Sequence, residues 1–287
     1  MNAPWHNHLR AQYPAKSLAG LRAALCYVYR SPEVSALRER HGDVGIDVLG
    51  SPFGSLLLLR AGFPRRVGVS GYAGGGRGCA DVIAYLENEY VGRAAVRQAG
   101  VLGLPEERWP ALRPQVFLTS VERAGGEAAW SGAAPSKRLL VGLGGGLPEK
   151  CWPLVSLRAV LTSLAKESGW TILLVGGPKD RMAGDELAQG LPAIRNLAGA
   201  VGLRDTLALT AAAGRVLCNS SFVMHAAAAF DRPTIVTLGP VYSSARAHAT
   251  QWSCNPRARV LGPEPGSPGL TSPEAVVAAL RDLPAAE

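Results

Sequence analysis

The chain has 287 residues, 47% of them hydrophobic, and carries 30 Lys and Arg against 22 Asp and Glu, a formal net charge of +8. This length is sufficient for one large or two medium domains with a substantial core. Aromatic residues make up only 6% of the chain, which argues against a stacking platform for single-stranded nucleic acid. The basic surplus favours nucleic acid, an anionic membrane surface or phosphorylated small molecules, but the densest basic cluster, Arg65-Arg66, is too small for a nucleic-acid arm.

The first half of the chain alternates helical patterns with short apolar strands. Apolar residues from Ser17 to Val28 recur at helical spacing. Ser51-Pro52 opens another helix, with proline in the first turn, where it is tolerated. We expect helices at 17–28, 33–40, 51–60 and 91–102, strands at 45–49 and 66–70, and a glycine-rich loop at 71–78. This alternation predicts a parallel sheet.

A stretch of small and polar residues separates the two halves. It runs from Ala124 to Lys137 and reads A-G-G-E-A-A-W-S-G-A-A-P-S-K, a composition typical of loops. We therefore predict one α/β domain at 1–125, a linker at 126–137 and a second α/β domain at 138–287.

The second half follows a more regular order of strand, loop and helix. Buried strands are expected at 138–143, 171–175 and 234–238, with a shorter one at 195–197 and another that ends near Leu217. Helices are expected after Pro153, after Asp180, at 203–212, after Ser221 and after Ser272. This order predicts a doubly wound, Rossmann-like half.

Cysteine spacing and the apolar runs indicate the cellular compartment. The cysteines are Cys26, Cys79, Cys151, Cys218 and Cys254. Because they are scattered and form no Cys-x-x-Cys pair, we expect reduced thiols, no disulfide framework and no metal site. His6 and His8 have no Cys or carboxylate partner nearby, so we assign them no metal either. The start has no apolar signal core and the leucine run 56–59 ends at Arg60, so we expect a cytoplasmic protein.

Three loops that follow strands in the second half carry the candidate chemistry. They are Gly144–Lys150, Gly176–Arg181 and Asn219–His225. In an open α/β sheet, ligands bind outside the carboxyl ends of the strands, so we expect all three loops to face one crevice. They offer glycine N–H groups, the amines of Lys150 and Lys179, hydroxyl groups and an imidazole.

The third of these loops delivers small polar residues to the start of a helix. Asn219, Ser220 and Ser221 precede His225 and four alanines. The first N–H groups of a helix lack intrahelical partners and carry partial positive charge, which suits a phosphate. A second interpretation stays open, in which Asn219 or Ser220 is only an N-cap, His225 is a core histidine and Lys150 is a solvated surface lysine.

Two common nucleotide motifs are absent from the glycine loops. No G-x-x-x-x-G-K-[ST] occurs, which argues against a P-loop nucleotidase. The Gly144 loop also fails G-x-G-x-x-G, because Pro148 and Lys150 stand in its later part, so a Rossmann oxidoreductase is only the third alternative. Two such halves joined by a linker, with the nucleotide on the C-terminal half, describe the GT-B fold.

The second half resembles glycosyltransferase family nine, the ADP-heptose:lipopolysaccharide heptosyltransferases. The likeness covers about Val141 to Gly239 and rests on the order and spacing of several short motifs. These are the glycine loop, Lys150 with Trp152-Pro153, Val175-Gly-Gly-Pro178, Asn196-Leu-Ala-Gly199, Leu203, Asn219-Ser-Ser with His225, Ala228 and Pro233, and Gly239-Pro240. The region from Ser51 to Gly68 is similar to the first domain of that family.

This resemblance implies a GT-B fold, with two Rossmann-like doubly wound domains that face a cleft. The first would be the acceptor side, and the second would bind the nucleotide sugar. The family's activity implies transfer of a heptose-type sugar from an ADP-heptose-like donor to a phosphorylated glycolipid, with inversion and with neither metal nor other cofactor. It also implies peripheral contact with the inner membrane and no nucleic-acid partner.

The resemblance also assigns roles to residues. Lys150 and His225 would stabilise the departing diphosphate and are the catalytic candidates. Val201 would meet adenine through its backbone, and Asp180 loosely matches an acidic residue used on the donor. The donor-binding candidates are Gly144, Gly145, Gly146, Lys150, Asp180, Val201, Ser220, Ser221 and His225.

Three departures from the family pattern leave an alternative open. Ser220 stands where the family has Asp, and Phe222 stands where it has Gly. From the resemblance we also expect that this sequence lacks the apolar strand and Gly-Asp loop that carry the family's general base. Asp43, in Gly42-Asp-Val44, is a poor substitute because it follows a charged helix. The alternative is a catalytically degenerate GT-B protein that binds a nucleotide sugar or a protein partner without turnover.

Overall fold

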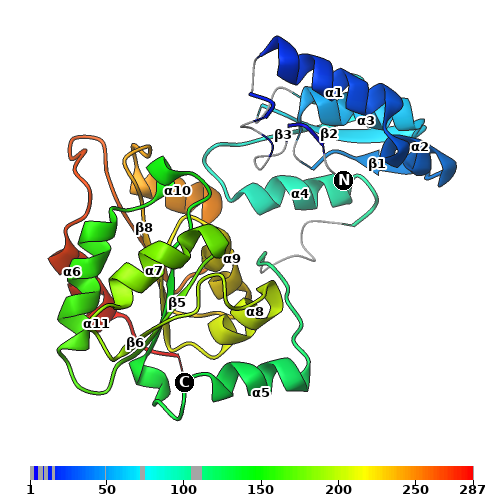
Figure 1. Cartoon of the computed structure of the whole chain (residues 1–287). Helices are drawn as coiled ribbons and strands as arrows, with labels where there is room; N and C mark the ends of the chain where they lie inside the picture. Colours follow the sequence, from blue (N-terminus) through cyan, green and yellow to red (C-terminus); the bar gives the residue numbers. More distant parts are fainter. Residues whose placement is uncertain are drawn as a thin grey trace. The chain divides into compact units, whose positions relative to one another are not determined.

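The computed structural model describes residues 3–5, 9, 12–14, 17–48, 50–71, 75–104 and 112–286. His6, His8 and part of the glycine-rich stretch at 71–78 lie outside the described residues. The chain divides into two compact units, residues 1–112 and 113–287, which Figure 1 shows with labels on most of their helices and strands. None of the helices in the described ranges is long and apolar enough to cross a membrane.

The division between the units lies earlier than the sequence boundary at 125, and the expected linker at 126–137 starts within a helix. Helix α5 (Ser120–Ala128) packs against α8 (Leu203–Ala211) of the second unit. A Cβ on Gly126 would stand 2.5 Å from the carbonyl oxygen of Ala208, so the glycine is what allows this close approach. Gly126, one of the small residues that suggested a loop, is therefore a packing residue.

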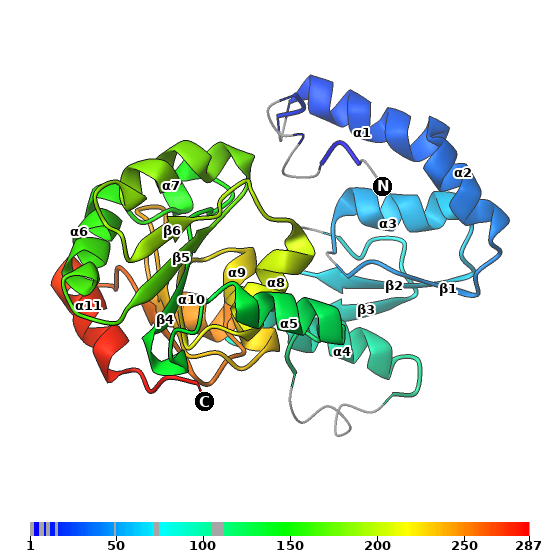
Figure 2. The same ribbon diagram turned by 60° about the horizontal axis from the view of Figure 1, so that its bottom comes forward.

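Unit 1 contains a three-stranded parallel sheet in the order β1-β2-β3. Its elements are α1 (Leu18–Arg30), α2 (Pro32–Glu39), β1 (Val44–Ile46), α3 (Pro52–Ala61), β2 (Arg65–Ser70), β3 (Asp81–Ala84) and α4 (Val91–Gly100). Figures 1 and 2 place α3 on one face of the sheet and α4 on the other. A small core of Val28, Val34, Leu57 and Leu58 joins α1, α2 and α3.

Unit 2 is built on a six-stranded parallel sheet in the order β6-β5-β4-β7-β8-β9. Its strands are β4 (Arg138–Gly142), β5 (Thr171–Val175), β6 (Ile194–Asn196), β7 (Arg215–Asn219), β8 (Thr234–Thr237) and β9 (Ala258–Leu261). Its other helices are α6 (Leu154–Ala165), α7 (Arg181–Ala188), α9 (Phe222–Ala229), α10 (Ala245–Trp252) and α11 (Pro273–Asp282). The order changes direction between β4 and β7, which is the arrangement of a doubly wound sheet.

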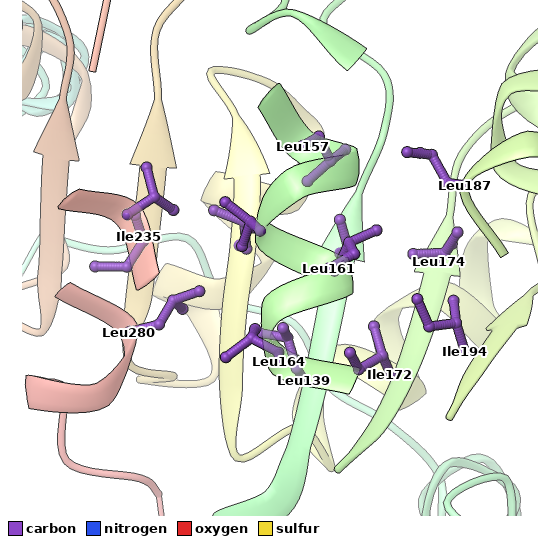
Figure 3. Packing of buried hydrophobic residues seen from close by; sticks show 14 of the residues in the cluster. Leu139, Leu157, Leu161, Leu164, Ile172, Leu174, Leu187, Ile194, Ile235 and Leu280 are labelled. Carbon is purple, nitrogen blue, oxygen red and sulfur yellow. The ribbon is translucent and has the colours of Figure 1, made fainter. Parts of the chain in front are cut away.

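Alternate residues of the central strands bury against different helix layers. Leu139 and Val141 of β4 belong to a core with α6, α7 and α11, whereas Leu140 belongs to a core with α8, α9 and α10. This alternation follows from the period of two in a strand. Figure 3 shows Leu161 and Leu164 of α6 lying over the sheet. Each fully buried leucine stabilises this layer by about 1.5–3 kcal/mol.

Candidate functional site

A pocket of about 490 Å³ opens at the carboxyl ends of β4, β5 and β7 in unit 2. It is lined by Gly144, Gly145, Gly146, Val175, Gly176, Gly177, Lys179, Asp180, Val201, Gly202, Leu203, Thr206, Ser221, Phe222 and Val223. The three loops singled out in the sequence therefore contribute to one concavity. It combines glycine backbone, an apolar wall and a few charged groups, which is the usual composition of a small-molecule site.

Asp180 lies between the first two glycine loops. Its Oδ2 accepts a hydrogen bond from the backbone N of Gly177 at 2.8 Å, which closes the turn after β5. A Cβ on Gly144 would stand 3.1 Å from that oxygen, and one on Gly176 would stand 2.8 Å from it. The two glycines thus make room for the carboxylate of Asp180, which lines the pocket.

The start of α9 has no side-chain cap. Ser221 occupies the N-cap position but its hydroxyl makes no capping hydrogen bond, and its carbonyl accepts from the N of Met224 at 3.1 Å. The first backbone N–H groups of α9 are therefore not capped by the Ser221 side chain. Ser221, Phe222 and Val223, at this end of the helix, all line the pocket. Phe222, the first residue of α9, is 45% exposed and lines the pocket too.

Asn219 has a different role from the N-cap considered above. Its Oδ1 accepts from the backbone N of Trp152 at 2.9 Å, and its Nδ2 donates to the carbonyl of Leu143 at 2.9 Å. The side chain is buried and joins the end of β7 to the end of β4 and to the segment before α6. Asn219 therefore holds the loop after β4 next to the end of β7. The sequence around Asn219 did not indicate this role.

Lys150, Ser220 and His225 are not among the residues that line the pocket. Lys150 ends a 3₁₀ turn, η4 (Pro148–Lys150), and its carbonyl accepts from the N of Gly239 at 3.2 Å. His225 is half-buried, and this burial lowers the pKa of its imidazole. The charges of Lys150 and His225 both lower the pKa of His248.

His248 was not singled out in the sequence. It lies on α10, only 7% exposed, and its Nε2 has no hydrogen-bond partner. Its ring packs edge-on against Tyr242, with 4.8 Å between ring centroids. Burial, together with the charges of Lys150 and His225, lowers the pKa of His248 to about 4. The polar and small residues of α10 gave no apolar periodicity, so no signal pointed to this helix.

In unit 1 the structure distinguishes two aspartates. Asp43 is exposed and precedes β1, so it lies at the amino end of that sheet, away from the edge where such sheets bind ligands. Asp47 follows β1 and is buried, and its Oδ1 accepts from the N of Gly50 at 3.0 Å. In the ranges that the structure describes, no group of three or more His, Cys, Asp or Glu side chains is arranged to hold a metal ion.

Comparison with known proteins places this geometry in context. The model of glycosyltransferase family 9 (heptosyltransferase) matches residues 34–265. Lipopolysaccharide heptosyltransferase 2 of Salmonella typhimurium is 39% identical over 77 residues, which are 25% of this chain and 22% of that protein. The curated relative is therefore matched over about a fifth of its own length.

Solved structures are similar over a longer part of the chain. The E. coli ADP-heptose lipopolysaccharide heptosyltransferase II has a TM-score of 0.65 and 27% identity, over 87% of this chain and 78% of that one. An E. coli heptosyltransferase solved with ADP has a TM-score of 0.65 and 19% identity, over 91% of this chain and 81% of that one. These likenesses confirm the predicted α/β GT-B fold with two Rossmann-like domains.

Proposed function

Because the chain belongs to glycosyltransferase family 9, we propose that it transfers a heptose-type sugar from a nucleotide diphosphate donor to a lipopolysaccharide-type acceptor. The observation that carries this proposal is the pocket at the carboxyl ends of β4, β5 and β7, where two glycine loops meet the uncapped start of α9. Backbone N–H groups aimed into such a crevice suit a diphosphate.

Each part of a nucleotide donor has a matching surface in or beside the pocket. The diphosphate would contact the amides around Ser221 and the nearby side chains of Lys150 and His225. Asp180 would accept hydrogen bonds from sugar hydroxyl groups, because its Oδ1 makes no bond within its own turn. Val201 and Leu203, which is 62% exposed, would cover the base. The E. coli heptosyltransferase solved with ADP supports an adenine nucleotide.

In the proposed reaction an acceptor hydroxyl attacks the anomeric carbon from the face opposite the diphosphate. The bond between that carbon and the diphosphate oxygen breaks, and the electron pair leaves with the oxygen, so the configuration inverts. Lys150 and the N-terminus of α9 would stabilise the developing negative charge by preorganised electrostatics, without a metal. The hydroxyl proton passes to a base, and the position of Asp43 at the amino end of β1 argues against that residue.

Calorimetric titration with ADP, UDP and GDP tests the donor site directly. We expect ADP to bind, and at about 100 times its Kd to stabilise the protein by about 2.7 kcal/mol. Transfer is then measured by mass spectrometry with ADP-heptose and a lipid A–sugar acceptor. If none of the three diphosphates binds at millimolar concentration, the pocket is not a nucleotide site and the proposal fails.

The acceptor side of the proposal includes contact with the inner membrane from the cytoplasm. Helix α1 exposes Leu18, Leu21 and Leu25, at 86%, 46% and 38%. The charged residues of α1 are Arg22 and Arg30. An apolar stripe flanked by arginines is the pattern of a helix that lies in an anionic membrane interface, where a phosphorylated glycolipid would be presented.

Vesicle flotation tests this contact. We expect the protein to float with vesicles that contain phosphatidylglycerol and to float less with pure phosphatidylcholine, because Arg side chains favour anionic lipid. Leu21→Asp should reduce flotation. Val155→Asp, at a residue on α6 that is 77% exposed, is the matched control and should not. Equal flotation of both variants would remove α1 from the proposal.

A second candidate function is donor binding without turnover. The observation that favours it is Phe222, whose bulky side chain lines the pocket beside the start of α9. Ser220 also lacks the carboxylate that the family has at this position and that would position a sugar. A pocket with Phe222 and without that carboxylate suits a bare nucleotide better than a nucleotide sugar. Tight ADP binding with no detectable transfer or hydrolysis of ADP-heptose would select this second candidate.

A further inference from the structure

A second pocket, of about 230 Å³, lies in unit 1 where α1, α2 and α3 pack against one another. Part of its lining is apolar and well packed, because Val28 of α1 and Val34 of α2 line it and are 0% and 4% exposed. In Figure 2, α3 lies between α1 and the sheet. The pocket has less than half the volume of the one at the carboxyl ends of β4, β5 and β7, so it suits a small charged group better than a nucleotide.

The residues that line this pocket include two arginines. Arg38 comes from the last turn of α2 and Arg60 from the last turn of α3. The Arg60 guanidinium lies 5.9 Å from the centroid of the Tyr29 ring, a cation–π contact that holds it at the pocket. Among the described residues neither arginine forms a salt bridge, although Glu39 also lines the pocket. Guanidinium groups bind phosphate through paired N–H donors, so this lining is suited to a phosphate group.

The pocket lies at the edge of unit 1 where the strands begin. Helix α2 ends shortly before β1 starts, and α3 ends shortly before β2 starts. The last turns of both helices, which carry the two arginines, are therefore at the amino edge of the sheet. Substrates of a parallel α/β sheet bind at the opposite edge, where the strands end. The pocket is thus separate from any substrate site at the carboxyl ends of β1 and β2.

An apolar stripe on α1 leads to the pocket. Its residues are Leu18, Leu21, Leu25 and Tyr29, each at least 38% exposed. They recur at every third or fourth position, so they lie along one side of the helix. Tyr29 belongs both to the stripe and to the lining of the pocket. A molecule with apolar chains and a phosphate fits this surface, because the chains cover the leucines while the phosphate reaches the arginines.

We propose that the pocket between α1, α2 and α3 binds the headgroup of a membrane lipid with a singly charged phosphodiester and free hydroxyl groups, the chemistry of phosphatidylglycerol. Two guanidinium groups and one carboxylate in the lining leave a net charge of +1, which matches one phosphodiester. Arg38 and Arg60 bind the phosphate oxygens, and Glu39 accepts a hydrogen bond from a headgroup hydroxyl. The inference rests on the membrane contact in the proposed function and adds a specific lipid site to it.

Calorimetry of the full chain with dihexanoyl phosphatidylglycerol tests the inference, because this short-chain lipid can be used as a soluble monomer. We expect saturable binding to the wild type. Arg38→Gln and Arg60→Gln should each bind about ten- to a hundredfold more weakly, since each loses a hydrogen bond to a charged group. Arg40→Gln is the matched control, because Arg40 is exposed at the same end of α2 but does not line the pocket. Equal affinities of the three variants, or no binding to the wild type, would overturn the inference.

Two further ligands identify the molecule that carries the phosphate. Dihexanoyl phosphatidylcholine has the same chains and phosphate, but its choline brings a positive charge and no hydroxyl group, so it should bind more weakly than the glycerol lipid. Inorganic phosphate lacks the chains and should also bind more weakly. If either ligand binds as tightly as dihexanoyl phosphatidylglycerol, the assignment to this lipid is wrong.

Vesicle flotation separates this inference from the proposed function. The double variant Arg38→Gln/Arg60→Gln should float less with phosphatidylglycerol vesicles than Arg40→Gln/Arg123→Gln, which loses the same charge at exposed positions outside the pocket. Both should bind ADP as the wild type does. Equal flotation of the two double variants would overturn the lipid site and leave the α1 contact intact. A wild type that binds the lipid but no nucleoside diphosphate would keep the lipid site and end the proposed donor function.

Discussion

Replacement of Asn219 by alanine is expected to destabilise the protein and loosen the pocket at the same time. The substitution removes two buried hydrogen bonds, one to the N of Trp152 and one to the carbonyl of Leu143, both 2.9 Å long. Each partner is then left without its bond, and such a loss costs about 1–3 kcal/mol. The expected decrease in the free energy of unfolding is about 2–4 kcal/mol, since the two loops can relax in part.

Urea unfolding followed by tryptophan fluorescence measures this change, and calorimetry with ADP measures the effect on the pocket. Asn196→Ala is the matched control. The Asn196 side chain also bonds to backbone, at Arg181 and Ala198, but it is half-buried and lies outside the pocket lining. We expect a smaller loss of stability there, with ADP affinity unchanged. A loss below about 0.5 kcal/mol for Asn219→Ala, within the range of ordinary surface substitutions, would refute the argument that this amide holds the loops after β4 and β7 together.

Three further outcomes follow from the structure. Lys150→Ala should weaken ADP binding by about 1.5–3 kcal/mol, the range for a hydrogen bond to a charged group. Lys166→Ala, at an exposed lysine after α6, is the control and should leave ADP binding unchanged. Equal ADP affinities of the two variants would show that Lys150 has no role in binding. The pKa of His248 is lowered from 6.5 to about 4 in the folded protein, so the unfolded chain binds the extra proton first and stability falls as pH drops from about 6.5 toward 4, by up to about 3 kcal/mol. In His248→Gln, urea unfolding should show a smaller fall in stability between pH 6.5 and 4. An equal fall in the variant and the wild type would contradict the lowered pKa of His248. Gly126→Val should separate α5 from α8 and lower the melting temperature, because its Cβ would stand 2.5 Å from the carbonyl of Ala208; an unaltered melting temperature would show that α5 is not held there.

The parallel sheets and the meeting of the glycine loops could be predicted because both depend on local patterns. Apolar runs such as Thr171–Val175 mark buried strands, and the carboxyl ends of parallel strands share an edge. Asp180 and Ser221, which lie on two of these loops, line the pocket, as does Val201, which was named from the family resemblance. What the residues could not indicate was that Lys150 and His225 lie beside the pocket lining rather than in it.

The elements that escaped prediction lack any local pattern. Strand β9 is an edge strand with only four residues, and α10 has few apolar side chains. Helix α5 contains Gly125-Gly126, which disfavours a helix in isolation, but its packing on α8 and the capping box of Thr119 and Glu122 stabilise it. The role of Asn219 and the lowered pKa of His248 depend on residues distant in sequence, and no single-chain pattern carries such information.

The bond from Asn219 to Leu143 joins residues 76 positions apart, which has a consequence for how the protein folds. The pocket cannot exist until β7 has paired with β4 across that long loop, and such non-local pairing is slow. A nucleotide therefore has nothing to bind during most of the folding reaction. A bound nucleotide therefore slows unfolding and lengthens the lifetime of the native protein, but it does not increase the folding rate.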